Sequence, residues 1–228
     1  MSPCHRARNS SQAPPKSSLY PTALFLLALT SLPGQSSAAN LPWGMAQTLD
    51  GSVQDLAALV VADLDQDGSD DVIGVGPGGL RWWPSSQAGI TIDAGTSDWQ
   101  QLIVRDLDAD GDPDLAAVSP TDGLCWWQNS SGDASTWSAS TIDGSVVGRG
   151  LAVADLNLDG TVDLIAGLGG GTGSVEWWSN TLGDGSNWVR AAVDASVAHS
   201  SSVAVVDLDR DGDPDVVATA DGSTDLLA

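Results

Sequence analysis

The nine-residue segment DLDQDGSDD at 63–71 has three close relatives elsewhere in this chain of 228 residues. They read DLDADGDPD at 106–114, DLNLDGTVD at 155–163 and DLDRDGDPD at 207–215. Successive copies start 43, 49 and 52 residues apart. Self-similarity at a period of this length indicates an array of small structural units rather than one irregular domain.

The similarity between the units extends well beyond the Asp-rich segment. Short apolar stretches flank each copy on both sides, and glycine-rich turns follow. Three copies are then followed by a tryptophan pair: Trp82-Trp83, Trp126-Trp127 and Trp177-Trp178. An apolar residue and an aspartate stand 12 or 13 residues ahead of each motif, at Leu49-Asp50, Ile92-Asp93, Ile142-Asp143 and Val193-Asp194.

This order predicts an all-β protein in which each unit is a four-stranded blade of a β-propeller. Three repeats are complete, at about 57–93, 101–143 and 150–194, and a partial fourth covers 202–228. Residues 43–50 match the outer strand of a unit and are expected to complete the closing blade. The strand before each motif is apolar at nearly every position, which predicts burial on both faces.

The motif D-x-D/N-x-D-G-x-x-D places side-chain oxygens at positions 1, 3, 5 and 9. They converge on one point only if the chain curls tightly, which the glycine at position 6 permits. Hard oxygen ligands without His or Cys favour Ca²⁺. The predicted metal ligands are Asp63, Asp65, Asp67, Asp71, Asp106, Asp108, Asp110, Asp114, Asp155, Asn157, Asp159, Asp163, Asp207, Asp209, Asp211 and Asp215.

An EF-hand shares the first six positions of this motif, but it needs a glutamate at position 12 and flanking helices. Position 12 is occupied here by Gly74, Ala117, Ala166 and Ala218. The segments that follow are short and apolar, which is typical of strands. The EF-hand interpretation therefore fails at every copy.

With these motifs, residues 43–228 resemble the FG-GAP/VCBS repeats, which form the calcium-bearing blades of integrin-α-like β-propellers. The resemblance implies that each Asp-rich loop joins the first two strands of its blade and binds Ca²⁺. Asn157 departs from the pattern and is expected to weaken the third site. Relatives of this kind close with about seven blades, so the chain is interpreted as a C-terminally truncated fragment of such a ring.

The first 39 residues carry three basic residues and no acid, and the apolar run 23–29 precedes the small residues 37–39. This order predicts a secretory signal peptide, residues 1–39, cleaved to leave a domain of residues 40–228. A Ser-rich organelle transit peptide is the alternative. The run is too short to span a bilayer. We therefore expect a secreted or cell-surface protein.

The net charge of −22 excludes ordinary binding to nucleic acid or to anionic membrane surfaces, because like charges repel. The catalytic possibilities are few. His199 is the only histidine after residue 39, and no lysine or tyrosine follows that point. Cys125, expected to be buried, is then the only cysteine, so no intrachain disulfide forms. We expect no enzymatic activity from this segment.

The tryptophan pairs are expected to fill the space between blades, because adjacent strand residues point to opposite faces. Trp99, in a loop without a counterpart in other units, is the better candidate for stacking on a sugar. Asn129-Ser130-Ser131 is a potential glycosylation site. The sequence thus predicts a secreted, calcium-stabilised module that binds an extracellular protein or glycan. The alternatives are a non-catalytic part of a larger extracellular enzyme, such as a polysaccharide lyase or esterase, and a structural spacer.

Overall fold

A computed structural model of the chain describes residues 24–26, 47–53, 55–85, 88–95, 98–170, 174–196 and 199–220. Every regular element in these ranges is a β-strand, which confirms the predicted all-β class. The same ranges contain no helix that is long and apolar enough to cross a membrane.

The strands form successive antiparallel sheets, which we call units one to four, and the first three are four-stranded. Unit one contains β3 (Ala58–Ala62), β4 (Asp71–Gly76), β5 (Gly79–Trp83) and β6 (Ile90–Asp93). Unit two contains β7 (Gln101–Arg105), β8 (Asp114–Ser119), β9 (Gly123–Asn129) and β10 (Trp137–Asp143). Unit three contains β11 (Gly148–Ala154), β12 (Asp163–Leu168), β13 (Ser174–Asn180) and β14 (Trp188–Asp194). Unit four contains β15 (Ser200–Val206) and β16 (Asp215–Ala220).

Each Asp-rich segment joins the first and second strands of its unit, as the resemblance implied. The aspartate at position 9 is the first residue of the second strand, where it pairs across to the last residue of the first strand. Asp71 faces Ala62 in this way, and Asp114 faces Arg105. The loop is therefore held at both ends by an antiparallel ladder.

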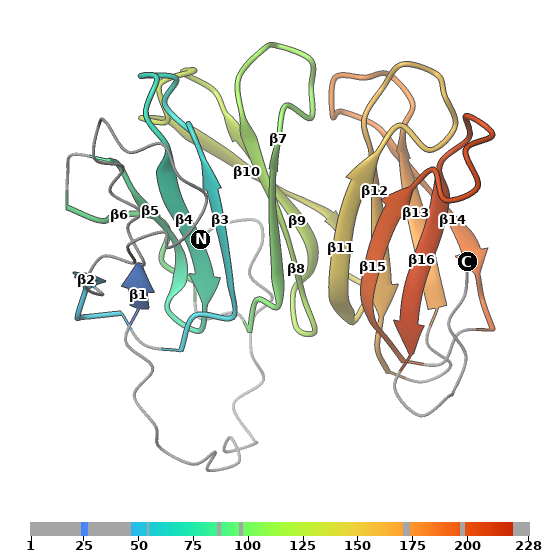
Figure 1. Cartoon of the computed structure of the whole chain (residues 1–228), viewed down its shortest axis with the longest axis horizontal. Helices are drawn as coiled ribbons and strands as arrows, with labels where there is room; N and C mark the ends of the chain where they lie inside the picture. Colours follow the sequence, from blue (N-terminus) through green and yellow to red (C-terminus); the bar gives the residue numbers. More distant parts are fainter. Residues whose placement is uncertain are drawn as a thin grey trace, which may run out of the picture.

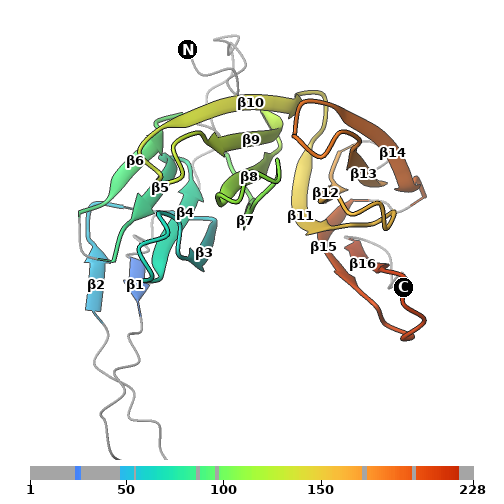
Figure 2. The ribbon, with the colours of Figure 1, turned by 90° about the horizontal axis from the view of Figure 1, so that it is seen from above.

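The units stand side by side in a curved row (Figure 2). The first strands β3, β7, β11 and β15 lie on the concave side, whereas β6, β10 and β14 lie on the convex side (Figure 2). All four Asp-rich loops lie along the same edge of the row, at the top of Figure 1. This is the blade arrangement of a β-propeller, in which the four described units form an arc (Figure 2).

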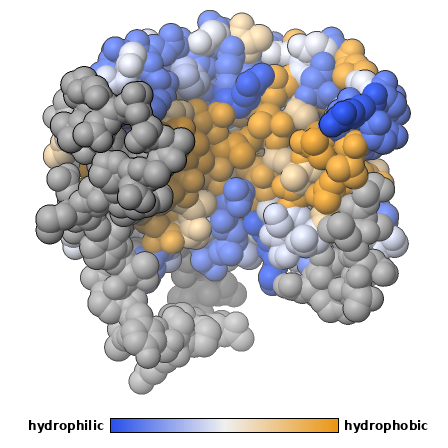
Figure 3. All heavy atoms as spheres, in the orientation of Figure 1, coloured by the Kyte–Doolittle hydropathy of each residue, from blue (hydrophilic) through white to orange (hydrophobic). Residues whose placement is uncertain are grey.

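The expectation that the strand before each motif is buried on both faces was wrong. The strand after the motif is the fully buried one, since all positions of β4, β8 and β12 are buried. In β3, by contrast, Leu59 and Val61 are 45% and 59% exposed. A first strand has a partner on one edge only and borders the open concave side. Figure 3 shows the apolar side chains gathered across the middle of that face.

The tryptophan pairs distribute their two indoles between opposite faces of each sheet, as predicted. Trp127 belongs to the apolar cluster between units one and two, whereas Trp126 belongs to the cluster between units two and three. Trp178 lies in that second cluster, whereas Trp177 packs against the apolar cluster that includes unit four. The hydrophobic core is thus a series of layers between units rather than one central core.

The short strand β2 (Gln47–Asp50) precedes unit one and pairs with β1 (Leu24–Leu26), which lies within the predicted signal peptide. The rest of that predicted leader, and residues 43–46 of the predicted outer strand, lie outside the described residues. Signal cleavage, ring closure and the number of blades stay predictions.

Candidate metal centres and ligand pocket

The four Asp-rich loops share one backbone conformation. The residue at position 4 has a left-handed backbone in every copy, with φ of 58°, 60°, 58° and 65° at Gln66, Ala109, Leu158 and Arg210. The glycine at position 6 also has positive φ, and its N–H donates to the carboxylate at position 1, at 3.0 Å from Gly68 to Asp63 and from Gly111 to Asp106. Glycine adopts this φ without steric cost, so the sequence pattern selects the curl directly.

The carboxylate at position 9 links the loop to a more distant strand. Asp114 Oδ2 accepts from the N–H of Leu107 at 3.1 Å, and its Oδ1 accepts from the N–H of Asn129 at 2.8 Å. Asp71 and Asp163 accept the same pair of bonds in units one and three. These three carboxylates are buried, so each stabilises the loop and also joins it to the third strand.

The structure gathers the carboxylates at positions 1, 3 and 9 in three of the loops, where one oxygen from each lies within 4.8 Å of the others. These groups are Asp63, Asp65 and Asp71; Asp106, Asp108 and Asp114; and Asp207, Asp209 and Asp215. The predicted ligands at position 5 are not in these groups. Each of their carboxylates accepts from the N–H at position 7 through one oxygen, as Asp67 Oδ1 does from Ser69 at 2.7 Å.

The third loop differs because of Asn157. Its Nδ2 donates to Asp159 Oδ2 at 2.8 Å, and its Oδ1 accepts from the N–H of Asp159 at 3.0 Å. Asp155 and Asp163 keep the same backbone bonds as their counterparts. Among the described residues, no group of three carboxylates forms in this loop.

The carboxylate oxygens of the first two loops are suitable ligands for a hard divalent cation. Asp63 Oδ1 and Asp106 Oδ1 are buried and have no hydrogen-bond donor, and an unpaired buried carboxylate oxygen is costly. Burial, followed by repulsion from Asp110, raises the pKa of Asp108. Burial also raises the pKa of Asp114 to about 7. A cation such as Ca²⁺ would supply the missing partner and favour the ionised form.

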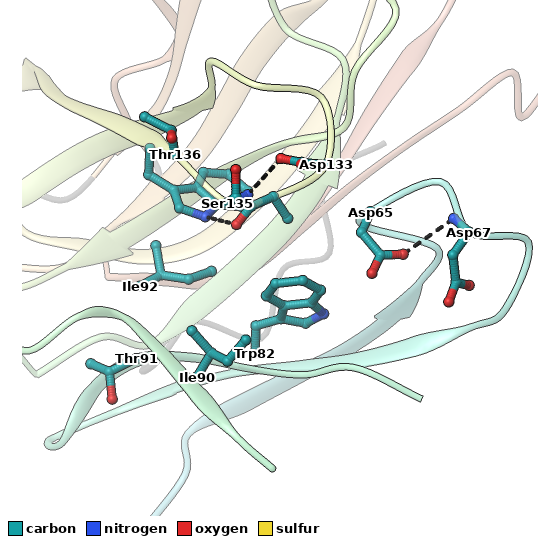
Figure 4. Close-up of a pocket in the computed structure, with 11 residues that line it drawn as sticks. Asp65, Asp67, Trp82, Ile90, Thr91, Ile92, Asp133, Ser135 and Thr136 are labelled. Carbon is teal, nitrogen blue, oxygen red and sulfur yellow. Dashed lines mark hydrogen bonds between the residues drawn. The ribbon is translucent and has the colours of Figure 1, made fainter. Parts of the chain in front are cut away.

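A pocket of about 790 Å³ lies between units one and two, next to the first Asp-rich loop (Figure 4). Unit one contributes Asp65 and Asp67 from that loop, together with Trp82 and the first residues of β6. Unit two contributes the turn that precedes β10. The lining residues are Asp65, Asp67, Trp82, Ile90, Thr91, Ile92, Asp133, Ala134, Ser135, Thr136 and Trp137. Its volume is within the range of small-ligand sites.

Comparison with known proteins identifies the repeat. Residues 106–166 and 159–218 both match the model of the FG-GAP-like repeat. The chain contains FG-GAP-like repeats. Among solved structures, it is similar to an Agrocybe aegerita lectin, described by its specific recognition of non-reducing terminal N-acetylglucosamine, with 22% identity and a TM-score of 0.46. The alignment covers 66% of this chain and 43% of the lectin chain. No curated protein matched in sequence.

Neighbouring FG-GAP units are joined by a hydrogen bond that sequence reasoning did not foresee. The second tryptophan of each pair donates from Nε1 to the aspartate that ends the strand preceding its own unit. The pairs are Trp83 to Asp50 at 3.2 Å, Trp127 to Asp93 at 3.1 Å and Trp178 to Asp143 at 3.4 Å. The regular apolar-Asp pair was the signal for this contact, but its partner lies 33 to 35 residues away in sequence.

Trp99 does not contact solvent, so its prediction as a sugar-stacking residue was wrong. Its side chain is 0% exposed and makes an edge-on contact with Trp127, with ring centroids 5.1 Å apart. Trp99 lies in the connection between units one and two, and its side chain fills the space between the two sheets. Val53 and Val146, in the connections that precede units one and three, are also buried.

Two other predicted features have clear outcomes. Cys125 is buried, as expected. Asn129, the candidate glycosylation site, is also buried, and its Nδ2 donates to the carbonyl of Leu64 in the neighbouring unit at 3.4 Å. An N-glycan therefore has no access to it in the folded protein. His199 lies before β15 with a left-handed φ of 55°.

The raised pKa of Asp114 predicts an unusual pH dependence for the calcium-free protein. The folded-state pKa of about 7 lies above the ordinary aspartate pKa of 3.8, so the folded state binds more protons between these two pH values. Its contribution to stability is therefore lost as the pH rises through about 7. Thermal melts in chelator should show a higher midpoint at pH 5 than at pH 7.5. Asp114→Asn, which cannot titrate, should reduce this difference, and an equal difference in the variant contradicts the assignment.

We expect Asn157→Asp to strengthen calcium binding by the third loop about tenfold, because a carboxylate would replace a neutral ligand that now pairs with Asp159. Titration calorimetry would resolve this site from the others. Asn187→Asp, which adds the same charge at an exposed position outside the loops, is the matched control. An equal change in both variants would mean that only overall charge is responsible.

Proposed function

We propose that this chain is a secreted, calcium-binding β-propeller module that binds a glycan in the pocket between units one and two. Calcium has mainly a structural role in this proposal. The leader is removed after about Ala39, which also removes β1 and leaves the edge of β2 free. The module itself has no catalytic activity.

The structural role of calcium follows from what the loop ligands already contact. Asp71 joins Leu64 in its own loop to Ser85 beyond β5 through backbone hydrogen bonds of 3.1 and 2.9 Å. A cation on the same carboxylate would hold the loop and the third strand together. Within the described ranges no disulfide provides that constraint, since Cys125 is the only cysteine there.

The proposed ligand class is inferred from the residues that line the pocket. Its walls combine apolar surface from Trp82, Ile90 and Trp137 with the hydroxyl groups of Thr91 and Thr136. Carboxylates of the first Asp-rich loop and of Asp133 border it. A neutral sugar offers hydroxyl donors to such carboxylates and apolar C–H faces to the walls. Anionic ligands are disfavoured by the charge of the site.

The pocket is tested with a matched pair of variants on a glycan array. Asp133 and Asp184 occupy equivalent turns, and each accepts from the serine two residues later, at 3.1 Å from Ser135 and 2.9 Å from Ser186. Only Asp133 lines the pocket. We expect Asp133→Ala to weaken binding of the best glycan at least about tenfold and Asp184→Ala to leave it unchanged.

Two results would overturn this function. Equal losses in the two variants would place the ligand elsewhere. Absence of binding to all neutral glycan classes by the calcium-loaded protein would favour the spacer. A further check comes from Asp65, which belongs both to the first carboxylate group and to the pocket wall. Chelation is therefore expected to reduce glycan binding as well as stability.

A further inference from the structure

The pocket between units one and two has two polar walls, and each is attached to the second Asp-rich loop (residues 106–114). One wall is the turn that precedes β10, and the other is the first Asp-rich loop (residues 63–71). No residue of the second loop lines the pocket. The second loop can therefore act on the pocket through the contacts that attach it to these two walls.

The turn is attached to the second loop through Asn129, which is fully buried. The N–H of Asn129 donates to Oδ1 of Asp114 in that loop at 2.8 Å. Its side-chain Oδ1 accepts from the N–H of Ala134, a pocket residue, at 3.1 Å. Asp112 of the loop also packs against Gly132 in the turn, since a Cβ on this glycine would lie 2.7 Å from the Asp112 carboxylate. The turn is thus joined to the loop by one bridging residue and one packing contact.

The other wall is attached through Gln66, which stands at position 4 of the first loop. Its neighbours in sequence, Asp65 and Asp67, both line the pocket. Nε2 of Gln66 donates to the carbonyl of Gly111 at 3.1 Å and to Oδ1 of Asp112 at 2.9 Å, and both acceptors belong to the second loop. The second loop is therefore bonded directly to the segment that carries the two pocket carboxylates.

The attachment to both walls distinguishes this interface from the one between units two and three. Unit three has an equivalent asparagine, Asn180, whose N–H donates to Asp163 at 2.9 Å and whose Oδ1 accepts from Gly185 at 3.1 Å. Position 4 of the second loop, however, is Ala109, whose methyl group offers no counterpart of the Gln66 bonds. Of these two interfaces, only the one with the pocket has both attachments.

We propose that the second Asp-rich loop is a control element for the pocket: when the loop holds a cation, it fixes both walls through Asn129 and Gln66. This inference rests on the calcium and glycan binding proposed above. The loop brings one oxygen from each of three carboxylates within 4.8 Å of the others, and like charges at this separation repel until a cation binds; they are Asp106, Asp108 and Asp114. Because coupling between two sites is reciprocal, a bound glycan strengthens calcium binding by this loop by the same factor.

Calcium alone tests this control in the full chain, with the amide of Ala134 as the reporter. We expect calcium to slow hydrogen exchange of this amide about tenfold or more. Asp106→Asn, which removes one carboxylate from the second loop, should abolish most of this protection. Asp207→Asn makes the same change in the fourth loop, where Asp207 also accepts from the glycine at position 6, at 3.2 Å instead of 3.0 Å. In this matched variant the protection of Ala134 should persist, although calorimetry should show weaker calcium binding in both variants.

Glycan affinity provides a second measurement, made with the neutral glycan that binds best on the array. Asp106→Asn should weaken its binding about fivefold or more. Gln66→Leu removes the amide donor, and Leu158 occupies the same position of the third loop with the same φ of 58°. This variant should weaken binding about threefold in calcium. The combined variant should lose less than the product of the two losses, because both substitutions act through one attachment.

The outcomes separate failure of this control from failure of the proposed function. If a glycan binds in the pocket but Asp106→Asn and Asp207→Asn change Ala134 exchange equally, the control is overturned and the function stands. If no neutral glycan binds but the Ala134 amide responds to the second loop alone, the control is supported and the ligand is wrong. Equal losses from Gln66→Leu with calcium and in chelator would overturn its part in the control. Asp108→Asn replaces Asp106→Asn if the latter does not fold.

Discussion

Removal of calcium is expected to lower the melting temperature of this protein by at least about 10 °C. A ligand at a hundred times its dissociation constant stabilises the folded state by about 2.7 kcal/mol for each site. Three loops gather three carboxylates each, and a domain of this size shifts by about 2–4 °C per kcal/mol. The expected loss therefore greatly exceeds the error of a thermal melt.

The measurement is a calorimetric or fluorescence melt with and without chelator at constant ionic strength. Chelator already saturated with calcium is the control, because it keeps the buffer and removes no metal. Readdition of Ca²⁺ should restore the original midpoint. An identical midpoint in all samples would contradict the calcium assignment, since a cation that binds only the folded state must stabilise it.

The second large effect is expected from Trp127, which lies between units one and two. Its side chain is 1% exposed, contacts Trp99 and donates to Asp93 at 3.1 Å. Trp127→Ala should destabilise the protein by about 3–5 kcal/mol through the cavity it leaves. It also leaves the buried carboxylate of Asp93 without this donor, which adds a desolvation cost. Denaturant unfolding would measure both effects together.

A matched pair of substitutions separates the hydrogen bond from the ring. Trp127→Phe and Trp126→Phe make the same chemical change at neighbouring buried positions. Trp126 Nε1 makes no hydrogen bond of good geometry, although burial, which raises the pKa of the Asp114 carboxyl, is opposed by the nearness of this indole N–H. Trp127 Nε1, by contrast, bonds Asp93. We expect Trp127→Phe to cost about 1–2 kcal/mol more than Trp126→Phe. Equal costs would mean that the bond between units contributes nothing to stability.

In the Asp-rich loops, the sequence spacing predicted which carboxylates converge but not which local hydrogen bonds they make. The convergence of the carboxylates at positions 1, 3 and 9, seen in three loops, was predicted from spacing alone, because nine contiguous residues with a glycine at position 6 determine their own curl. Position 5 was also predicted as a ligand, and in the structure one oxygen of Asp67 accepts from the N–H of Ser69. Spacing restricts which oxygens can meet, but it does not decide whether a short backbone bond competes for one of them.

The ligand pocket depends on contacts that no local pattern records. Trp82 and Asp133 are 51 residues apart in sequence, yet both line it because units one and two stand side by side. Trp99 shows the opposite case. Its polar surroundings in sequence indicated an exposed loop, but the connection passes between two sheets and its indole is buried there.

By itself, the sequence determined the repeats, the strand-forming segments and the chemistry of the loops, because these properties depend on residues within about ten positions of one another. The tertiary structure alone decided which strand of each unit is buried, which indole meets which aspartate, and which loops of adjacent units are joined. The physical reason is that all three depend on the space between adjacent sheets. That space is filled by residues from two units, and its shape is defined only when the units are stacked.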